Sequence, residues 1–288
     1  KVAVTIDGVL FTEYRYGHYA CRPFFYPVLT SDRQHLTRRY PMESVEDETQ
    51  DHYHHRGVYV AHGLVNGFDL WSESTDHGAM LQCGDPEVTS DGEIATIEGQ
   101  IDWVGPEGQK ILQEQRSIQI RPEENFRIID HQSDFLAKYG NVSFGDTKEG
   151  GLFSIRVPTS MDAKAKGRIE NSEGLTYDSG RGEEITWGKQ AVWVDYSGPL
   201  ANGDEWGHTV IDHKDNPRHP SYWHVRGYGL FTANPFGVHD FKDDKSIDES
   251  MTILDGDKKV FRYRWIVHPG RGVTDPRVVE LIDEFLGA

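Results

Sequence analysis

Cysteine is nearly absent from this chain of 288 residues, which contains only Cys21 and Cys83. No CxxC pair exists, so a structural zinc ribbon is excluded. One disulfide could form in an oxidising compartment, but two free core thiols fit the sequence at least as well. The chain is long enough to bury most of its apolar surface without such staples.

Long apolar runs and excess positive charge are also missing. No stretch of about eighteen apolar residues occurs, so we expect no membrane-spanning helix. The 30 Lys and Arg residues face 47 Asp and Glu, a net charge of −17, which argues against nucleic acid and anionic membrane surfaces as partners. A neutral ligand such as a sugar is compatible with this charge, whereas an acidic polymer would need a local basic patch.

Several motifs of common enzymes are missing as well. The chain has no GxGxxG after a strand, no P-loop, no HExxH and no GxSxG, so we expect neither a nucleotide cofactor nor a lipase-like serine mechanism. It begins at Lys1 and enters a strand-like run at once. This start is typical of a processed or trimmed chain, and we expect a secreted or periplasmic protein.

Short strands separated by turn residues dominate the pattern. Asp7-Gly8 between residues 2–6 and 9–14 predicts a hairpin, as does the turn 105–108 between residues 93–104 and 110–120. Residues 125–137 should add a third strand. Further strands are expected at 58–61, 152–157, 191–196, 208–212, 222–226 and 259–267.

The remaining segments complete the expected fold. Asp275-Pro276 opens a helix with an apolar side of Val278, Val279, Leu281, Ile282 and Phe285, and Gly287 follows its end. The polar, glycine-spotted residues 160–189 predict a long loop. We therefore expect a single all-β domain over residues 1–288, an antiparallel β-sandwich with one short C-terminal helix.

Asp51-His52-Tyr53-His54-His55-Arg56-Gly57 is the densest polar feature. Imidazole can act as an acid or base near neutral pH, and it is the commonest metal ligand in proteins. The cluster therefore predicts general acid–base chemistry or a metal site. A hydrogen-bonded turn with buried, satisfied histidines is the alternative.

Two further regions carry similar side chains. Glu149 precedes Gly150-Gly151 and a strand, where a carboxylate could serve as base, nucleophile or metal ligand. The loop 212–220 and the strand after it combine histidines, Arg226 and aromatic residues, as a sugar or carboxylate site requires. A turn glutamate in solvent and a structural loop are the alternatives.

Several runs together resemble a known group: residues 23–29, 37–42, 51–57, 65–67, 148–151, 213–220, 223–226 and 234–237. They look like the bacterial PmoA-like domain-of-unknown-function family, often labelled "methane oxygenase". We reject that label, because the methane oxygenase subunit is an integral membrane protein. Members are typically encoded near sugar oxidoreductases and isomerases, which implies carbohydrate chemistry. Size and β content are also similar to the galactose-mutarotase-like supersandwich.

Three hypotheses follow. The first is a carbohydrate-active enzyme, a glycoside hydrolase or lyase, with Glu149 as base or nucleophile, His55 or His224 as proton partner, and Asp51 or Asp195 as a second carboxylate. Its expected substrate-binding residues are His52, His54, Arg56, His62, Asn66, Arg156, His213, Asn216, His219, Trp223, Arg226 and Tyr228. The second is a metal enzyme, with His52, His54 and a further His or Glu binding a divalent ion such as zinc. The third is a non-catalytic glycan-binding module.

Overall fold

A three-stranded meander forms the centre of the larger of two sheets. In the computed structural model, which describes residues 1–17, 20–178 and 185–287, the strands are β7 (Ala95–Val104), β8 (Lys110–Glu123) and β9 (Phe126–Leu136). Along β8, Leu112 and Ile118 are buried while Gln115 and Gln119 are exposed. The period-two pattern thus places one face against the core, and both predicted hairpins are confirmed.

The larger sheet contains ten strands, and every neighbouring pair described is antiparallel. Its order is β13 (Thr176–Asp178), β12 (Arg168–Asn171), β14 (Trp193–Pro199), β15 (Glu205–Asp212), β19 (Lys258–Pro269), β9, β8, β7 and β5 (Ala79–Gln82), with β6 (Glu87–Ser90) also on β7.

The smaller sheet contains seven strands in the order β1 (Val2–Ile6), β2 (Val9–Arg15), β3 (Phe24–Val28), β4 (Val58–His62), β11 (Gly150–Arg156), β17 (Leu230–Ala233) and β16 (Trp223–Val225). Its pairs are also antiparallel, as is the separate ladder of β10 (Val142–Phe144) with β18 (Met251–Ile253). The expected all-β antiparallel sandwich is confirmed.

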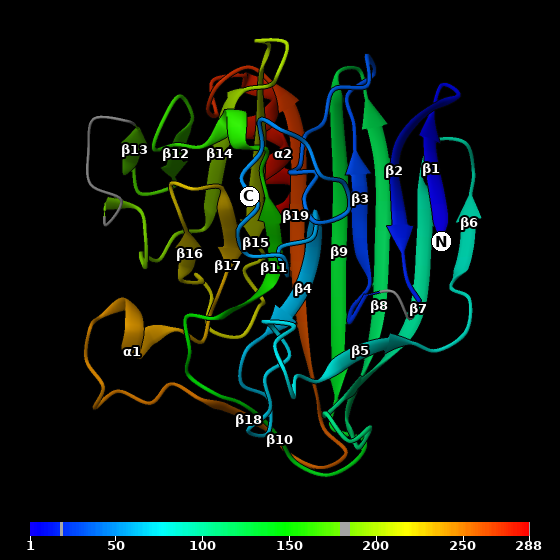
Figure 1. Cartoon of the computed structure of the whole chain (residues 1–288), viewed down its shortest axis with the longest axis vertical. Helices are drawn as coiled ribbons and strands as arrows, with labels where there is room; N and C mark the ends of the chain where they lie inside the picture. Colours follow the sequence, from blue (N-terminus) through cyan, green and yellow to red (C-terminus); the bar gives the residue numbers. More distant parts are fainter. Residues whose placement is uncertain (18–19, 179–184, 288) are drawn as a thin grey trace.

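The two sheets pack face to face, as Figure 1 shows. The Phe11 ring of β2 lies 6.5 Å from the Trp265 ring of β19, and Phe153 of β11 lies 5.9 Å from Tyr263 and 6.2 Å from Trp265. Successive β19 residues alternate in direction, so Ile266 faces the other way. It packs with the C-terminal helix rather than with the inter-sheet core.

That helix, α2 (Pro276–Leu286), begins and ends where the sequence predicts. The Asp275 side chain accepts a hydrogen bond from Arg277 N, and Gly287 closes the helix with φ +69°. Val278, Leu281 and Ile282 are buried against the larger sheet. The placement of Val279 on the apolar side is wrong, because its side chain is 45 % exposed.

Residues 160–189 are more ordered than expected. They begin within the 3₁₀ turn η1 (Thr159–Met161) and include β12 and β13, which extend the larger sheet through β14; residues 179–184 lie outside the described residues. The short helix α1 (Val238–Phe241) was also not predicted. Both cysteines are free: Cys21 is half-buried and Cys83 is exposed, so neither lies in the core. Across the described residues no helix combines the length and apolar character needed to cross a membrane.

Candidate functional site

A row of polar side chains crosses the outer face of the seven-stranded sheet. Tyr59 of β4 lies opposite Ser154 of β11, Ser154 opposite Thr232 of β17, and Thr232 opposite His224 of β16. Directly paired residues point to the same face of a sheet. All four are buried, so the loops in front of this face cover the row (Figure 1).

The chain between β3 and β4 forms one of these covers. Arg38, which has no exposed side-chain surface, donates to Tyr40 O, Thr49 O and His52 O and to Asp51 Oδ1. One guanidinium thereby fixes four points of the segment that leads into the histidine cluster. Gly57 ends the cluster with φ +58°, and a β-carbon there would collide with Phe25 O.

Asp51 joins two buried arginines. Its Oδ1 lies 2.5 Å from Arg38 Nη1 and 3.0 Å from Arg156 Nη2, while its own side chain is 42 % exposed. Burial alone would raise the pKa of Asp51, but Arg156 and Arg38 hold it below the ordinary value. Asp51 therefore remains ionised in neutral and mildly acidic solution.

His52 is oriented by the same carboxylate. Its Nδ1 lies 3.1 Å from Asp51 Oδ2, and its ring stacks on His55 at 4.9 Å and on Tyr228 at 5.2 Å. The imidazole is 41 % exposed, so it faces solvent. A carboxylate on Nδ1 fixes the tautomer that leaves Nε2 available to accept a proton.

Asp162, which sequence reasoning missed, lies beside Arg156. Burial raises the pKa of its carboxyl to about 6, against the effects of Arg156 and Lys164. Its Oδ1 and the Nε of Arg156 are buried without a hydrogen-bond partner. They lie 3.0 Å and 3.3 Å from the position that a β-carbon on Gly229 would take, so both atoms border the space that glycine leaves open.

The other histidines here are held neutral. Burial lowers the pKa of His54 to about 4, with Arg22 adding to the effect, and it lowers the pKa of His55 well below the ordinary value, with His54 and Arg156 adding. The Nδ1 of His55 lies 3.2 Å from Arg156 Nη1, so it accepts from the guanidinium. His55 thus orients Arg156 rather than exchanging protons with solvent.

Glu149 and His224 lie elsewhere on the sheet. Gly63 N donates to Glu149 O at one end of β11, and Arg156 N donates to Gly57 O at the other, which places Glu149 and His55 roughly 20 Å apart. Glu149 is an exposed turn residue paired with Lys148. His224 is buried near Lys148, and burial lowers its pKa to about 3. The expected convergence of Glu149 with His55 is therefore wrong.

Three expected substrate ligands have structural partners instead. Arg56 makes a two-point ion pair with Glu73, at 2.9 Å and 2.7 Å. His62 is fully buried between Phe144 and Phe236, with Nε2 2.8 Å from Gly145 O. Trp223 is 1 % exposed and donates to Ala191 O, so no face of its indole is free for a sugar.

The turn and loop residues among the expected ligands also stabilise the fold. Asn66 joins its turn to the chain at Ser143. Asp212, fully buried, accepts from Asn216 Nδ2 and lies 2.9 Å from His219 Nδ1, and His213 accepts from Asp215 N. The loop 212–220 therefore has a structural role, which is the alternative to a sugar or carboxylate site.

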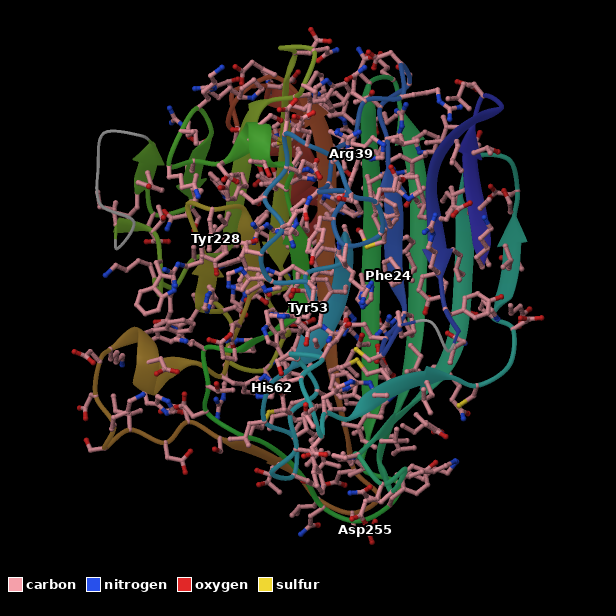
Figure 2. The ribbon with its side chains drawn as sticks, viewed as in Figure 1. Phe24, Arg39, Tyr53, His62, Tyr228 and Asp255 are labelled. Atoms are coloured by element: carbon pink, nitrogen blue, oxygen red, sulfur yellow. The ribbon has the colours of Figure 1, made fainter. Side chains whose placement is uncertain are left out.

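Arg226 and Tyr228 do lie at the site. The Arg226 guanidinium lies 5.3 Å from the Tyr228 ring centre and 5.8 Å from that of Trp187, and Arg156 lies 4.9 Å from the same Tyr228 ring. Tyr228, which is labelled in Figure 2, and His52 are both partly exposed. The Tyr228 and His52 side chains give the site a partly accessible wall of aromatic rings.

Metal ligation has no geometric support. In the part of the chain that the structure describes, no three His, Cys, Asp or Glu side chains are arranged to hold an ion. The guanidinium at His55 Nδ1 would also repel a cation there.

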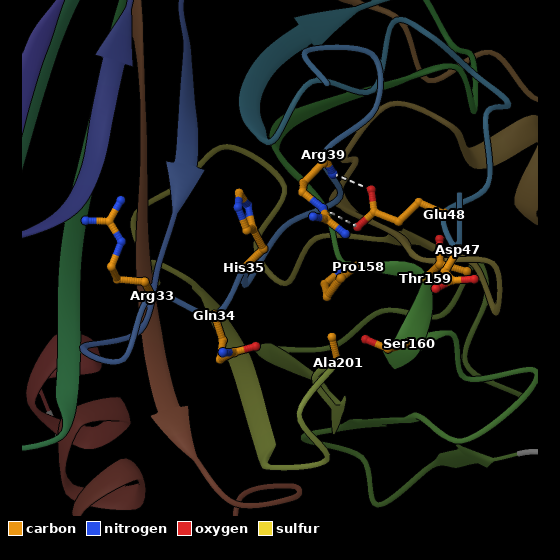
Figure 3. A pocket seen from close by; sticks show the side chains of 10 residues that line it. All are labelled: Arg33, Gln34, His35, Arg39, Asp47, Glu48, Pro158, Thr159, Ser160 and Ala201. Atoms are coloured by element: carbon orange, nitrogen blue, oxygen red, sulfur yellow. Dashed lines mark hydrogen bonds and ion pairs between the residues drawn. The ribbon is translucent and has the colours of Figure 1, made fainter. Parts of the chain in front are cut away.

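An open cleft of about 620 Å³ adjoins the site (Figure 3). Its wall includes Thr159, whose Oγ1 lies 3.2 Å from Thr49 Oγ1, and Thr49 Oγ1 in turn lies 3.4 Å from Arg156 Nη2. The other lining residues are Arg33, Gln34, His35, Arg39, Asp47, Glu48, Pro158, Ser160 and Ala201. Thr159 and Thr49 thus connect the wall of the cleft to the Arg156 guanidinium.

Comparison with known proteins shows the family to which this chain belongs. Residues 1–282 match the family of unknown function DUF6807. The chain belongs to this family. No curated protein matches it. Among solved structures, a galactose 1-epimerase from Lactobacillus acidophilus is similar at 9 % identity with a TM-score of 0.35, covering 94 % of this chain and 98 % of that one. The DUF6807 description assigns no activity, so the function must be argued from the site.

Proposed function

We propose that this DUF6807 protein is a carbohydrate-active enzyme that cleaves or isomerises a glycoside, with Asp162 as proton donor and His52 as base. The observation that carries the proposal is Asp162: a buried carboxyl with a pKa of about 6 and an unpartnered oxygen, beside the ionised Asp51. Two acids whose pKa values are pushed apart are what acid–base chemistry at mild pH requires.

The roles follow from position. Asp162 would protonate the leaving oxygen as its bond to the sugar breaks. His52, oriented by Asp51, would remove a proton from water in hydrolysis or from a ring carbon in elimination. In hydrolysis the hydroxide then adds to the anomeric carbon, and solvent exchange returns both side chains to their starting protonation states. Arg156 is a positioning residue that holds Asp51 and lies beside Asp162.

Sugar binding fits the surroundings of these groups. The ring faces of His52 and Tyr228 pack on each other, on His55 and on Arg156, so a sugar would meet their exposed edges. The cleft beyond Thr49 and Thr159 has the volume of an ordinary ligand site and a polar wall of hydroxyl, amide and guanidinium groups. The rest of an oligosaccharide would lie there. A secreted or periplasmic location fits such a substrate and remains a prediction.

A screen of the purified chain against neutral and acidic glycosides tests the proposal, with released sugars identified by mass spectrometry. We expect turnover by the wild type and a loss of about 10²-fold or more in Asp162→Asn. Asp215→Asn is the matched control, because that side chain is 66 % exposed on the loop that follows β15. Sugar binding without turnover by the wild type would instead indicate a glycan-binding module.

A further inference from the structure

Buried positive charge collects beside the proposed centre, although the whole protein carries −17. Arg38 and Arg156 share Asp51, and Arg22 and Arg56 share Glu73. Arg22, Arg38 and Arg156 are at most 1 % exposed. Four guanidiniums thus have two carboxylates within ion-pair distance among the described residues.

Further negative charge comes from Asp162, beside Arg156, and from Asp69, whose pKa Arg22 helps to lower. The Asp69 oxygens accept hydrogen bonds from Trp71 N, from Ser72 N and from the Ser72 hydroxyl. With Asp69 and Asp162 included, the carboxylates equal the guanidiniums in number, so the unpaired donors of Arg22, Trp71 and Tyr59 carry the case for a ligand.

The same place holds buried donors without acceptors. Arg22 Nε, Arg22 Nη1 and Trp71 Nε1 have no hydrogen-bond partner, and neither does the Tyr59 hydroxyl. These groups are neighbours, because Arg22 lies 5.1 Å from the Tyr59 ring centre, whose distance to the Trp71 ring is 5.4 Å. A buried donor left without an acceptor costs free energy, so a set of them points to an acceptor-rich ligand.

The polar groups around Arg22, Trp71 and Tyr59 do not supply acceptors for these donors. The Arg22 Nη2 donates to Trp71 O and to Cys21 Sγ, which leaves its other two nitrogens uncommitted. His54 and His55 pack against Trp71, which is 1 % exposed, and they follow the exposed Asp51, His52 and Tyr53 in the chain. A ligand would therefore reach these donors through movement of the 51–54 turn.

We infer that the site binds an anionic group of its substrate, the carboxylate of a uronic acid or the sulfate ester of a sugar, with Arg22, Trp71 and Tyr59 as its ligands. The inference rests on the proposed function and names its substrate class. It supplies the local basic patch that an acidic sugar needs on an acidic protein. Arg38 and Arg156 add favourable charge without direct contact.

Calorimetric titration at constant ionic strength tests the inference, with glucuronate, glucose 6-sulfate, glucose and inorganic sulfate as separate ligands. We expect an acidic sugar to bind at least tenfold more tightly than glucose. Preference for glucuronate or for the sulfate ester identifies the anion. Equal affinity for glucose and both acidic sugars, or binding of inorganic sulfate alone, would overturn the inference.

Trp71→Phe gives the sharper readout, because it removes the Nε1 donor and keeps an aromatic ring. We expect acidic-sugar affinity to fall roughly threefold to tenfold while glucose affinity stays unchanged. Arg22→Lys should weaken the acidic sugar in the same selective way, and Trp206→Phe, on β15, is the control. An unchanged acidic-sugar affinity in both site variants would contradict the assignment.

The outcomes also separate this inference from the proposed function. Turnover of a neutral glycoside with no preference for acidic sugars overturns the anion site and leaves the enzyme proposal intact. Tight binding of an acidic sugar without turnover of any glycoside supports the anion site and overturns the enzyme proposal.

Discussion

The Oδ1 of Asp162 and the Nε of Arg156 lie 3.0 Å and 3.3 Å from the point that a β-carbon would take at Gly229, and neither atom has a hydrogen-bond partner. One is an acceptor or a proton donor, and the other is a donor. A single hydroxyl that reached both atoms would satisfy them, since it can donate and accept. This arrangement gives the proposed centre a definite position on the fold and several measurable consequences.

Asp162→Asn should stabilise the protein at neutral pH. The folded carboxyl has a pKa of about 6 against an unfolded value of 3.8, so between pH 4 and 6 the folded state keeps a proton that the unfolded state has lost. The free energy of unfolding therefore falls as the pH rises through this window, by about 3 kcal/mol. Asp162→Asn has no carboxyl at this position, so its free energy of unfolding should not fall in this way. Urea unfolding at pH 4 and pH 7 should show its advantage only at pH 7.

His52→Asn should reduce turnover about 10²-fold or more, because it removes the proposed base while leaving the fold intact at an exposed position. Asp51→Asn should also lower turnover and alter its pH profile, since the imidazole loses the group that orients it. His77→Asn, outside the site, is the control. Equal turnover rates in His52→Asn and His77→Asn would remove His52 from the mechanism.

Glu149→Gln distinguishes the sequence-based assignment from the structural one. Glu149 is exposed, pairs with Lys148 and lies at the far end of β11 from Arg156, so we expect turnover within about twofold of the wild type. Steady-state kinetics on the first substrate found would measure it. A large loss of turnover would return Glu149 to the catalytic set and count against a centre at Asp162.

Glu114 and Arg116 form a buried ion pair between the sheets, at 2.7 Å and 2.9 Å. The Glu114 carboxylate also accepts from Trp103 Nε1 and Ser133 Oγ. Arg116→Met would leave this carboxylate buried without its counter-ion, so the free energy of unfolding should fall by about 3–5 kcal/mol. Adding Glu114→Gln should recover part of the loss. Denaturant titration of both variants measures the effect.

Local patterns predicted much of the fold. Asp7-Gly8 and the turn 105–108 fix hairpins by turn chemistry, and Asp275 and Gly287 cap the last helix. These signals lie within a few residues of one another, so a sequence shows them directly. The strands β12 and β13 escaped notice because their polar, glycine-spotted sequence is accommodated only by pairing with β14.

The site could be predicted only in part. The 51–57 cluster pointed to the region of the proposed site, since three histidines in four residues are conspicuous. Asp162 has no such signal: it is a single acid between Met161 and Ala163, and its raised pKa arises from burial. Glu149 misled because Gly150-Gly151 looks like a close approach for a ligand, whereas Gly150 makes room for the His62 ring.

The pH dependence of kcat/KM, measured on wild type and Asp162→Asn with a glycoside from the screen, tests the central claim most directly. If Asp162 donates a proton, wild-type kcat/KM should fall above about pH 6 as that carboxyl ionises, and this limb should be absent from the residual activity of Asp162→Asn. A variant that keeps full turnover, with the same limb near pH 6, would contradict the account.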